Sequence, residues 1–172
     1  RGILSGTDDI YERLEASCER INLPVAEDAN THTVWRCWGE GPPVVLLHGD
    51  WGSWTHFIRN IDILAARYRV LVPDMPGYGD SGFPPLDDVV ADSAVIMTSD
   101  IDKLIGKNVD YDIVGFSYGG IHAGHMAALH SGRVGKVVLI GAGGMGIDAP
   151  VLYKRPMQRL SRDMDWSTRK AV

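Results

Sequence analysis

A serine between two glycines is the residue of this sequence that is best placed to do chemistry. The segment Gly115-Phe116-Ser117-Tyr118-Gly119 fits the pattern G-x-S-x-G, and it joins a predicted strand to a predicted helix. Gly115 and Gly119 lack a Cβ, so they can approach neighbouring backbone closely at a tight turn. We therefore expect the Ser117 hydroxyl to lie exposed at a helix N-terminus, where N–H groups stabilise a developing negative charge. The alternative is a glycine-rich turn with an incidental serine.

Two further glycine-containing loops each follow a predicted strand. The segment His48-Gly49-Asp50-Trp51-Gly52 follows the apolar run 43–47, and residues 74–82, with the sequence DMPGYGDSG, follow the run 68–73. Continuous apolar runs bounded by turns are typical of strands buried on both faces of a parallel sheet. Asp74 is expected to cap a turn.

Two other chemistries are weaker alternatives. His122 and His125 are three residues apart on a predicted helix, a spacing that suits metal ligands, but no carboxylate or cysteine partner is evident. Residues 141–146 follow a predicted strand and fit G-x-G-x-x-G, the dinucleotide-binding pattern. That pattern requires a helix opening within it, and Asp148-Ala149-Pro150 interrupts any such helix. We therefore favour a glycine-rich loop near the active site, and we expect no cofactor and no metal.

The elements that position these loops alternate between strands and helices. Residues 1–8 are predicted to be a loose arm, and the strand 134–140 is nearly all apolar and is expected to be buried. The alternation predicts an α/β fold with a mostly parallel, doubly wound sheet. The helices are predicted over 9–19, 54–68, 90–104 and 118–130, and the strands over 20–25, 31–38, 43–47, 68–73, 111–114 and 134–140.

The composition fits one globular domain and excludes several classes of protein. The 172 residues are 45% hydrophobic, with a formal net charge of -5, so no basic surface for nucleic acid is expected. No apolar run approaches the roughly 20 residues that span a membrane. Cys18 and Cys37 have no C-x-x-C spacing and are expected to be free thiols in a reducing compartment, which predicts a cytoplasmic protein.

The three loops in this order resemble the α/β-hydrolase superfamily, in its serine-nucleophile branch, from about Arg20 onward. The resemblance implies that Ser117 is the nucleophile and that backbone N–H groups of Tyr118 and of Asp50 or Trp51 form an oxyanion hole. His48 would begin the oxyanion loop and shape it, rather than act as the base. The substrate pocket is expected to include four residues: His48, Gly49, Trp51 and Phe116.

The resemblance also suggests a substrate class. Glycine-rich loops after strand 134–140 are similar to those of the carbon–carbon bond hydrolases, and other members of the superfamily are esterases. We therefore expect a small-molecule carbonyl substrate, either an ester or a ketone next to the bond that is cleaved. An aspartate nucleophile, as in dehalogenases and epoxide hydrolases, is disfavoured because the turn carries Ser117. The alternative from another class is a non-catalytic protein that binds a small ligand.

Residues 1–147 are predicted to form the hydrolase core with six strands, and residues 148–172 to begin a helical cap. In the superfamily the triad acid and histidine lie on loops beyond the cap. No histidine follows His130 in this sequence, and Asp148 is a disfavoured candidate for the acid. We therefore expect the sheet to be incomplete at its C-terminal side, and a second segment or chain to complete both sheet and triad.

Overall fold

The protein forms one six-stranded, mostly parallel sheet, which confirms the predicted α/β class. The structure is a computed structural model that describes residues 5–25 and 28–144, without the side chains of residues 5–8 and 28–30. Across the sheet the strands run in the order β1-β2-β4-β3-β5-β6, and only β2 is antiparallel to its neighbours. The strands are β1 (Glu19–Val25), β2 (Asp28–Trp38), β3 (Pro43–Leu47), β4 (Arg69–Asp74), β5 (Tyr111–Phe116) and β6 (Val134–Ile140).

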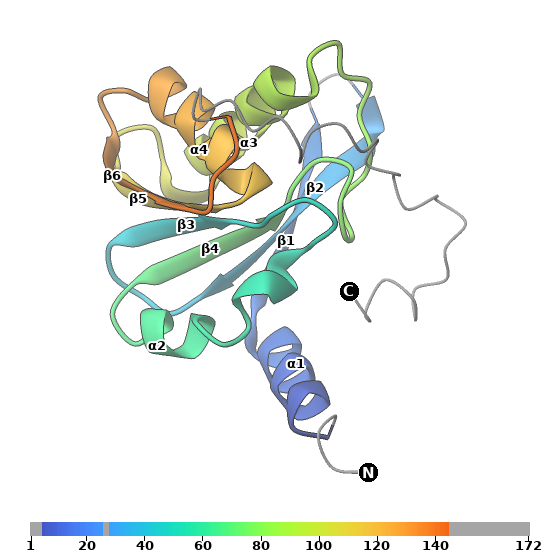
Figure 1. Cartoon of the computed structure of the whole chain (residues 1–172), viewed down its shortest axis with the longest axis vertical. Coiled ribbons are helices and arrows are strands. Elements are labelled where there is room, and N and C mark those ends of the chain that lie inside the picture. Colours follow the sequence, from blue (N-terminus) through green and yellow to red (C-terminus); the bar gives the residue numbers. More distant parts are fainter. Residues whose placement is uncertain (1–4, 26–27, 145–172) are drawn as a thin grey trace.

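Helices cover both faces of the sheet, as the doubly wound arrangement requires (Figure 1). Helices α3 (Val89–Ile105) and α4 (Tyr118–Leu129) lie on one face. Helices α1 (Ser5–Ser17) and α2 (Ile61–Ala65), with the short 3-10 helix η1 (Trp54–Phe57), lie on the other. No helix among the described residues is long and apolar enough to cross a membrane.

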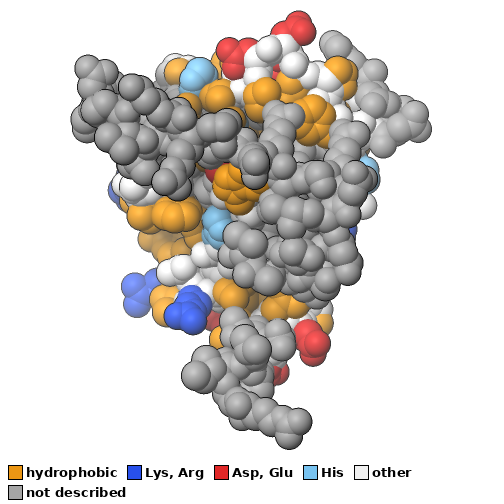
Figure 2. All heavy atoms as spheres, turned by 45° about the vertical axis from the view of Figure 1, so that its right-hand side comes forward, with side chains coloured by type: hydrophobic (Ala, Val, Ile, Leu, Met, Phe, Trp, Pro, Cys, Tyr) orange, Lys and Arg blue, Asp and Glu red, His pale blue; other side chains and the backbone are white. Residues whose placement is uncertain are grey.

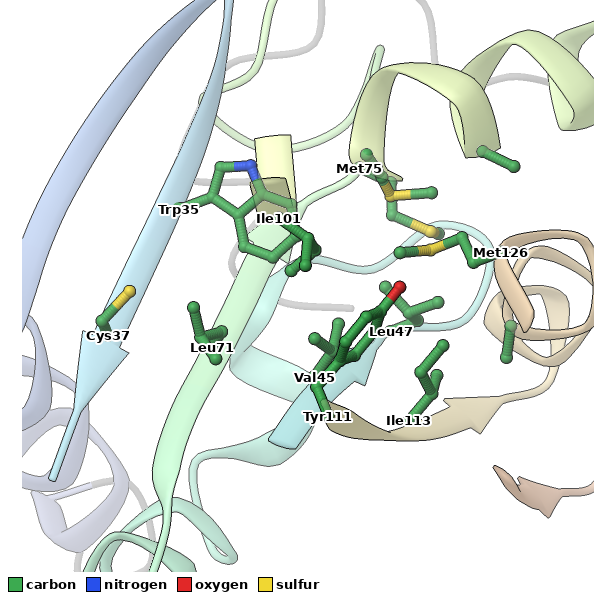
Figure 3. Close-up of a cluster of buried hydrophobic side chains, with 13 residues drawn as sticks. Trp35, Cys37, Val45, Leu47, Leu71, Met75, Ile101, Tyr111, Ile113 and Met126 are labelled. Carbon is green, nitrogen blue, oxygen red and sulfur yellow. The ribbon is translucent and has the colours of Figure 1, made fainter. Parts of the chain in front are cut away.

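Two hydrophobic clusters explain why the central strands are apolar throughout. In β3, Val45 and Leu47 pack toward α3 and α4, in the cluster shown in Figure 3, whereas Val44 and Leu46 pack toward α1 and η1. Successive side chains of a strand point to opposite faces, so a strand covered on both sides needs hydrophobic residues at every position. The sheet therefore holds the ends of β3, β4 and β5 rigidly, and the three loops follow those ends.

Two helix predictions were wrong in detail. The predicted arm 1–8 is in part helical, since α1 begins at Ser5, and acidic residues at positions 8 and 9 favour the N-terminal end of a helix. The predicted helix 54–68 is split into η1 and α2. Trp54 and Phe57 are both buried in the same cluster. A 3-10 turn aligns residues three apart, so it lets both aromatic rings enter the core.

Strand β6 differs from its prediction in burial, although its bounds are those predicted. It pairs with β5 on one side, and it is an edge strand of the sheet that the described residues form. Its residues Val137, Val138, Leu139 and Ile140 are 40–48% exposed. Helix α4 contacts β6, yet within the described residues these four side chains remain exposed. Figure 2 brings forward the side of the molecule away from β6, where hydrophobic side chains are also visible.

Candidate active site

Ser117 has the backbone geometry of a strained turn between β5 and α4. Its φ of 52° and ψ of -114° lie in a region that residues with a side chain rarely adopt. Backbone hydrogen bonds hold this conformation: the Ser117 N–H donates to the carbonyl of Ile140 at 2.9 Å, and the Gly120 N–H donates to the carbonyl of Ser117 at 3.0 Å. Ser117 is half-buried and caps α4 without using its side chain as the cap. Its hydroxyl is thus left for another role.

The glycines on either side make this turn possible. A Cβ at Gly115 would lie 2.6 Å from the carbonyl oxygen of Gly119 in α4. A Cβ at Gly119 would lie 2.3 Å from the carbonyl oxygen of Leu47 and 2.5 Å from that of His48, at the end of β3. Real Cβ atoms do not approach backbone this closely, so both positions require glycine. The steric reason inferred from the sequence therefore holds for both glycines.

The loop after β3 lies directly against the turn at Ser117. A Cβ on Gly49 would be 3.1 Å from the Cβ of Ser117 and 3.1 Å from the ring of Phe116. Phe116 is 38% exposed beside it. Gly49 lies more than sixty residues before Phe116 and Ser117 in the sequence. The fold brings the three residues together at one edge of the sheet.

The backbone N–H groups of this loop are not equivalent. Trp51 has a φ of 62°, and its N–H donates to the Asp50 carboxylate at 3.0 Å. The N–H of Asp50 has no such acceptor among the described residues. Across the site, Tyr118 is the first residue of α4, whose N-terminal N–H groups carry partial positive charge. Of the two donors considered in the loop, the N–H of Asp50 is therefore the better placed to bind an anion.

His48 is held as a structural residue. It is 0% exposed, its Nδ1 lies 2.8 Å from the carbonyl oxygen of Gly49, and its Nε2 accepts the N–H of Met75 at 3.0 Å. Burial lowers its pKa to about 3, so the ring stays neutral. Both nitrogens are engaged within the loops after β3 and β4. His48 is thus fully buried and ties the two loops together.

His56 is a neighbour of the site that the sequence did not indicate. Its Nδ1 accepts the N–H of Gly49 at 3.2 Å, and its ring stands edge-on to Phe116 with centroids 5.6 Å apart. Desolvation lowers its pKa, which favours the neutral ring that this hydrogen bond needs. The residue comes from η1, and only the break of the predicted helix into two parts places it here.

A buried ionic cluster fixes the loop after β4. Arg36, 1% exposed, donates to Asp74 at 3.0 Å, to Asp80 at 2.6 Å and to Glu15 at 2.6 Å, and it stacks on Trp54 at 5.0 Å. Asp74 also accepts the backbone N–H groups of Trp54 at 2.9 Å and Asp80 at 3.0 Å. Asp74 therefore does more than cap a turn: it joins β2, η1 and the loop 74–82.

The family of the chain follows from a match over most of its sequence. The family model for the alpha/beta hydrolase fold matches residues 42–172. The chain belongs to the α/β hydrolase family. It is 37% identical over 130 residues to 2-hydroxy-6-oxo-6-phenylhexa-2,4-dienoate hydrolase of Burkholderia cepacia, covering 70% of this chain and 42% of that protein. It is 36% identical over 107 residues to pimeloyl-[acyl-carrier protein] methyl ester esterase of Vibrio atlanticus (strain LGP32), covering 62% and 38%.

Solved structures share the fold of this chain. A bacterial membrane phospholipase A superposes with a TM-score of 0.68 at 27% identity, over 81% of this chain and 44% of that one. Naproxen esterase of Bacillus subtilis superposes with a TM-score of 0.62 at 22% identity, over 76% and 47%, which shows the fold alone. The chain spans about two fifths of the length of the curated relatives it matches.

The structure bears on two alternatives that the sequence left open, a dinucleotide-binding loop and a metal site. Residues 141–144 of the G-x-G-x-x-G segment form no helix, and the Gly143 N–H donates to the carbonyl of Ser117 at 3.4 Å, so this part of the segment supports the nucleophile turn. His122 is buried with its Nδ1 3.2 Å from the carbonyl oxygen of Tyr118, and His125 is exposed. Among the described residues, no group of three potential metal ligands comes together.

The remaining predictions concern the two cysteines, the helical cap and the candidate acid. Cys18 and Cys37 are free thiols, and burial raises the pKa of the Cys37 thiol to about 12, which makes it unreactive. The predicted cap 148–172 and the candidate acid Asp148 lie outside the described residues. Within the described part of the chain, no imidazole is hydrogen-bonded to the Ser117 hydroxyl.

Proposed function

We propose that the whole protein is a serine hydrolase that attacks a carbonyl carbon, either of an ester or of a ketone next to a carbon–carbon bond. The observation that carries this proposal is the strained backbone of Ser117, held at the start of α4 and against the loop of Gly49. A conformation of this cost persists where the surrounding structure enforces it, and such sites are commonly functional. The names of the relatives, a dienoate hydrolase and a methyl ester esterase, support both substrate types.

The proposed chemistry assigns one role to each group at the turn. The Ser117 Oγ forms a bond to the carbonyl carbon and gives its proton to a base. The N–H groups of Asp50 and Tyr118 donate to the oxygen that becomes negatively charged. The base then protonates the leaving fragment, and water releases the acyl group from Ser117. Trp51 takes no part as a donor, because its N–H is already bound by Asp50.

We propose that the base and its orienting acid come from a segment or chain beyond residues 1–172. The support is twofold: no described imidazole reaches the Ser117 hydroxyl, and the curated relatives are more than twice as long as the matched part. Residues 1–172 expressed alone should therefore show no ester turnover. A monomer of these residues with the turnover of the whole protein would contradict this and would direct attention to His48, His56 and His122.

The test of the function compares two serine variants of the whole protein. Ser117→Ala should lower the rate of hydrolysis of a p-nitrophenyl ester at least about 10³-fold, because nucleophile and base act as a unit. Ser99→Ala, an exposed serine of α3, is the matched control and should retain the rate. The same pair, assayed with a methyl ester and with a 2-hydroxy-6-oxodienoate, decides between ester and carbon–carbon cleavage. Equal activity of Ser117→Ala and wild type would refute the proposal, and an inactive wild type that binds these compounds would favour the non-catalytic alternative.

A further inference from the structure

One oxygen of the Asp50 carboxylate joins the loop after β3 to the loop after β4, beside the turn at Ser117. The Tyr78 hydroxyl donates to Oδ1 of Asp50 at 2.5 Å, and the backbone N–H of Trp51 donates to the same Oδ1 at 3.0 Å. Tyr78 belongs to the loop after β4, whereas Asp50 and Trp51 belong to the loop that contacts Ser117 through Gly49. The pair therefore crosses from one loop to the other at the point where the oxyanion donor is expected.

Tyr78 is itself held firmly by its own loop. Its N–H donates to the carbonyl of Met75 at 2.9 Å, and its carbonyl accepts the N–H of Ser81 at 2.9 Å. Its neighbour Gly79 has a φ of 51°, and a Cβ there would lie 2.3 Å from the Asp74 carboxyl group. The Tyr78 ring also stands edge-on to His48, with centroids 5.2 Å apart. The hydroxyl thus projects from a firmly held turn toward the loop after β3.

The hydrogen bond from Tyr78 to Asp50 bears on which backbone N–H of the loop is free for the substrate oxygen. Trp51 has a φ of 62°, a strained value for a residue with a side chain, and the Asp50 carboxylate stabilises it by accepting the Trp51 N–H. If the carboxylate rotates away, the Trp51 N–H is released, and the Asp50 side chain no longer restrains its own Cα, to which the Asp50 amide nitrogen is bonded. The N–H of Asp50 would then lose its fixed direction. An oxyanion hole works only when its donors are fixed before charge develops.

We propose that Tyr78 is a positioning residue, which acts through the Asp50 carboxylate to aim the Asp50 N–H at the substrate oxygen. This inference rests on the proposed function. The Tyr78 hydroxyl has a second consequence, because its proton partly neutralises a carboxylate in the loop next to the forming oxyanion. Loss of the hydroxyl should therefore weaken binding of the charged transition state more than binding of the neutral substrate.

The test uses Tyr78→Phe in the whole protein, with Tyr111→Phe as the matched control. Tyr111 also donates or accepts one hydrogen bond through its hydroxyl, to His130 at 2.9 Å, but it begins β5 at the far end from Ser117. Tyr78→Phe should lower kcat about tenfold with little change in KM, the effect of losing one charge-assisted hydrogen bond. It should weaken an alkyl boronic acid, which becomes a tetrahedral anion, by a similar factor. Tyr111→Phe should change neither value.

A measurement that does not depend on enzyme activity, the exchange rate of a backbone amide, tests this proposal separately from the proposed function. Backbone amide exchange of Trp51 should be about tenfold faster in Tyr78→Phe and in Asp50→Ala than in wild type. Asp50→Asn keeps an oxygen acceptor and should restore slow exchange. If wild type is inactive but the Trp51 amide responds in this way, the serine mechanism fails while the loop geometry stands. Unchanged Trp51 exchange, or a fall in thermal stability without a change in kcat or boronate affinity, would overturn the role of Tyr78.

Discussion

The turn at Ser117 and the two loops beside it, after β3 and after β4, are held by different kinds of interaction. The turn at Ser117 is held by backbone hydrogen bonds and by the absence of side-chain atoms at Gly115 and Gly119. The loops after β3 and β4 are held by buried side chains, with His48 and Asp74 at their centre. Added atoms at the two glycines should therefore disrupt the turn, whereas the loops depend on their buried side-chain partners. Substitutions that add or remove a few atoms should distinguish the two regions.

The largest effect is expected from adding one methyl group to the turn. Gly119→Ala places a Cβ 2.3 Å from the carbonyl oxygen of Leu47, so β3 and α4 must separate. We expect a loss of more than about 4 kcal/mol in the free energy of unfolding. Gly124→Ala on the same helix is the control, because nothing lies within 4 Å of its added Cβ. It should stabilise the protein by up to about 1 kcal/mol. Equal stability of the two variants in urea denaturation would mean that the turn is not sterically constrained.

The next effect concerns the loops and requires removal of a partner. Arg36→Met leaves the buried carboxylate of Asp74 without its cation, which should cost about 3–5 kcal/mol. The double variant Arg36→Met/Asp74→Asn removes the unpaired charge and should recover part of that loss. The exposed pair Arg13–Asp62 supplies the control, since Arg13→Met should change the urea midpoint far less. A loss for Arg36→Met no greater than that for Arg13→Met would show that the cluster does not hold the loop.

The effect that is smallest near neutral pH is the pH dependence that His48 contributes. Its pKa is about 3 in the folded protein and near 6.5 when unfolded, so protonation favours the unfolded chain. Stability from this residue is present above about pH 6.5 and is lost as the pH falls toward 3, with a slope of at most about 1.4 kcal/mol per pH unit. His48→Gln should be less stable at pH 7 but should show a shallower decline between pH 6.5 and 4. Parallel curves for the two proteins would contradict a buried neutral His48.

The same contrast explains what could be predicted from the sequence. The turn at Ser117 was predictable because its cause is local: two glycines at fixed spacing between a strand and a helix. The strand Pro43–Leu47 was predictable for a similar reason, since its apolar run records burial on both faces. Arg36 was not predictable as the partner of Asp74, because nothing in the alternating pattern of a strand marks one arginine as buried. Its role depends on Glu15 in α1 and on Asp74 and Asp80 in the loop 74–82, two segments that are distant from it in the sequence.

The residues of the loop after β3 were also only partly predictable from the sequence. The sequence left open whether Asp50 or Trp51 offers the backbone N–H, because the choice depends on a side-chain hydrogen bond to Tyr78 from another loop. His56 was missed because an even helical pattern over 54–68 concealed the break after Phe57. The exposure of β6 depends on what lies beside it, which its own apolar residues do not reveal.

The central claim is that the strained turn presents Ser117 as a nucleophile, and covalent labelling tests it most directly. The whole protein should be treated with a fluorophosphonate and digested, and the modified peptide sequenced by mass spectrometry. The account predicts one phosphonylated residue, Ser117, with no labelling after Ser117→Ala and full labelling of Ser99→Ala. Modification at another serine, or equal labelling of the Ser117→Ala variant, would contradict it.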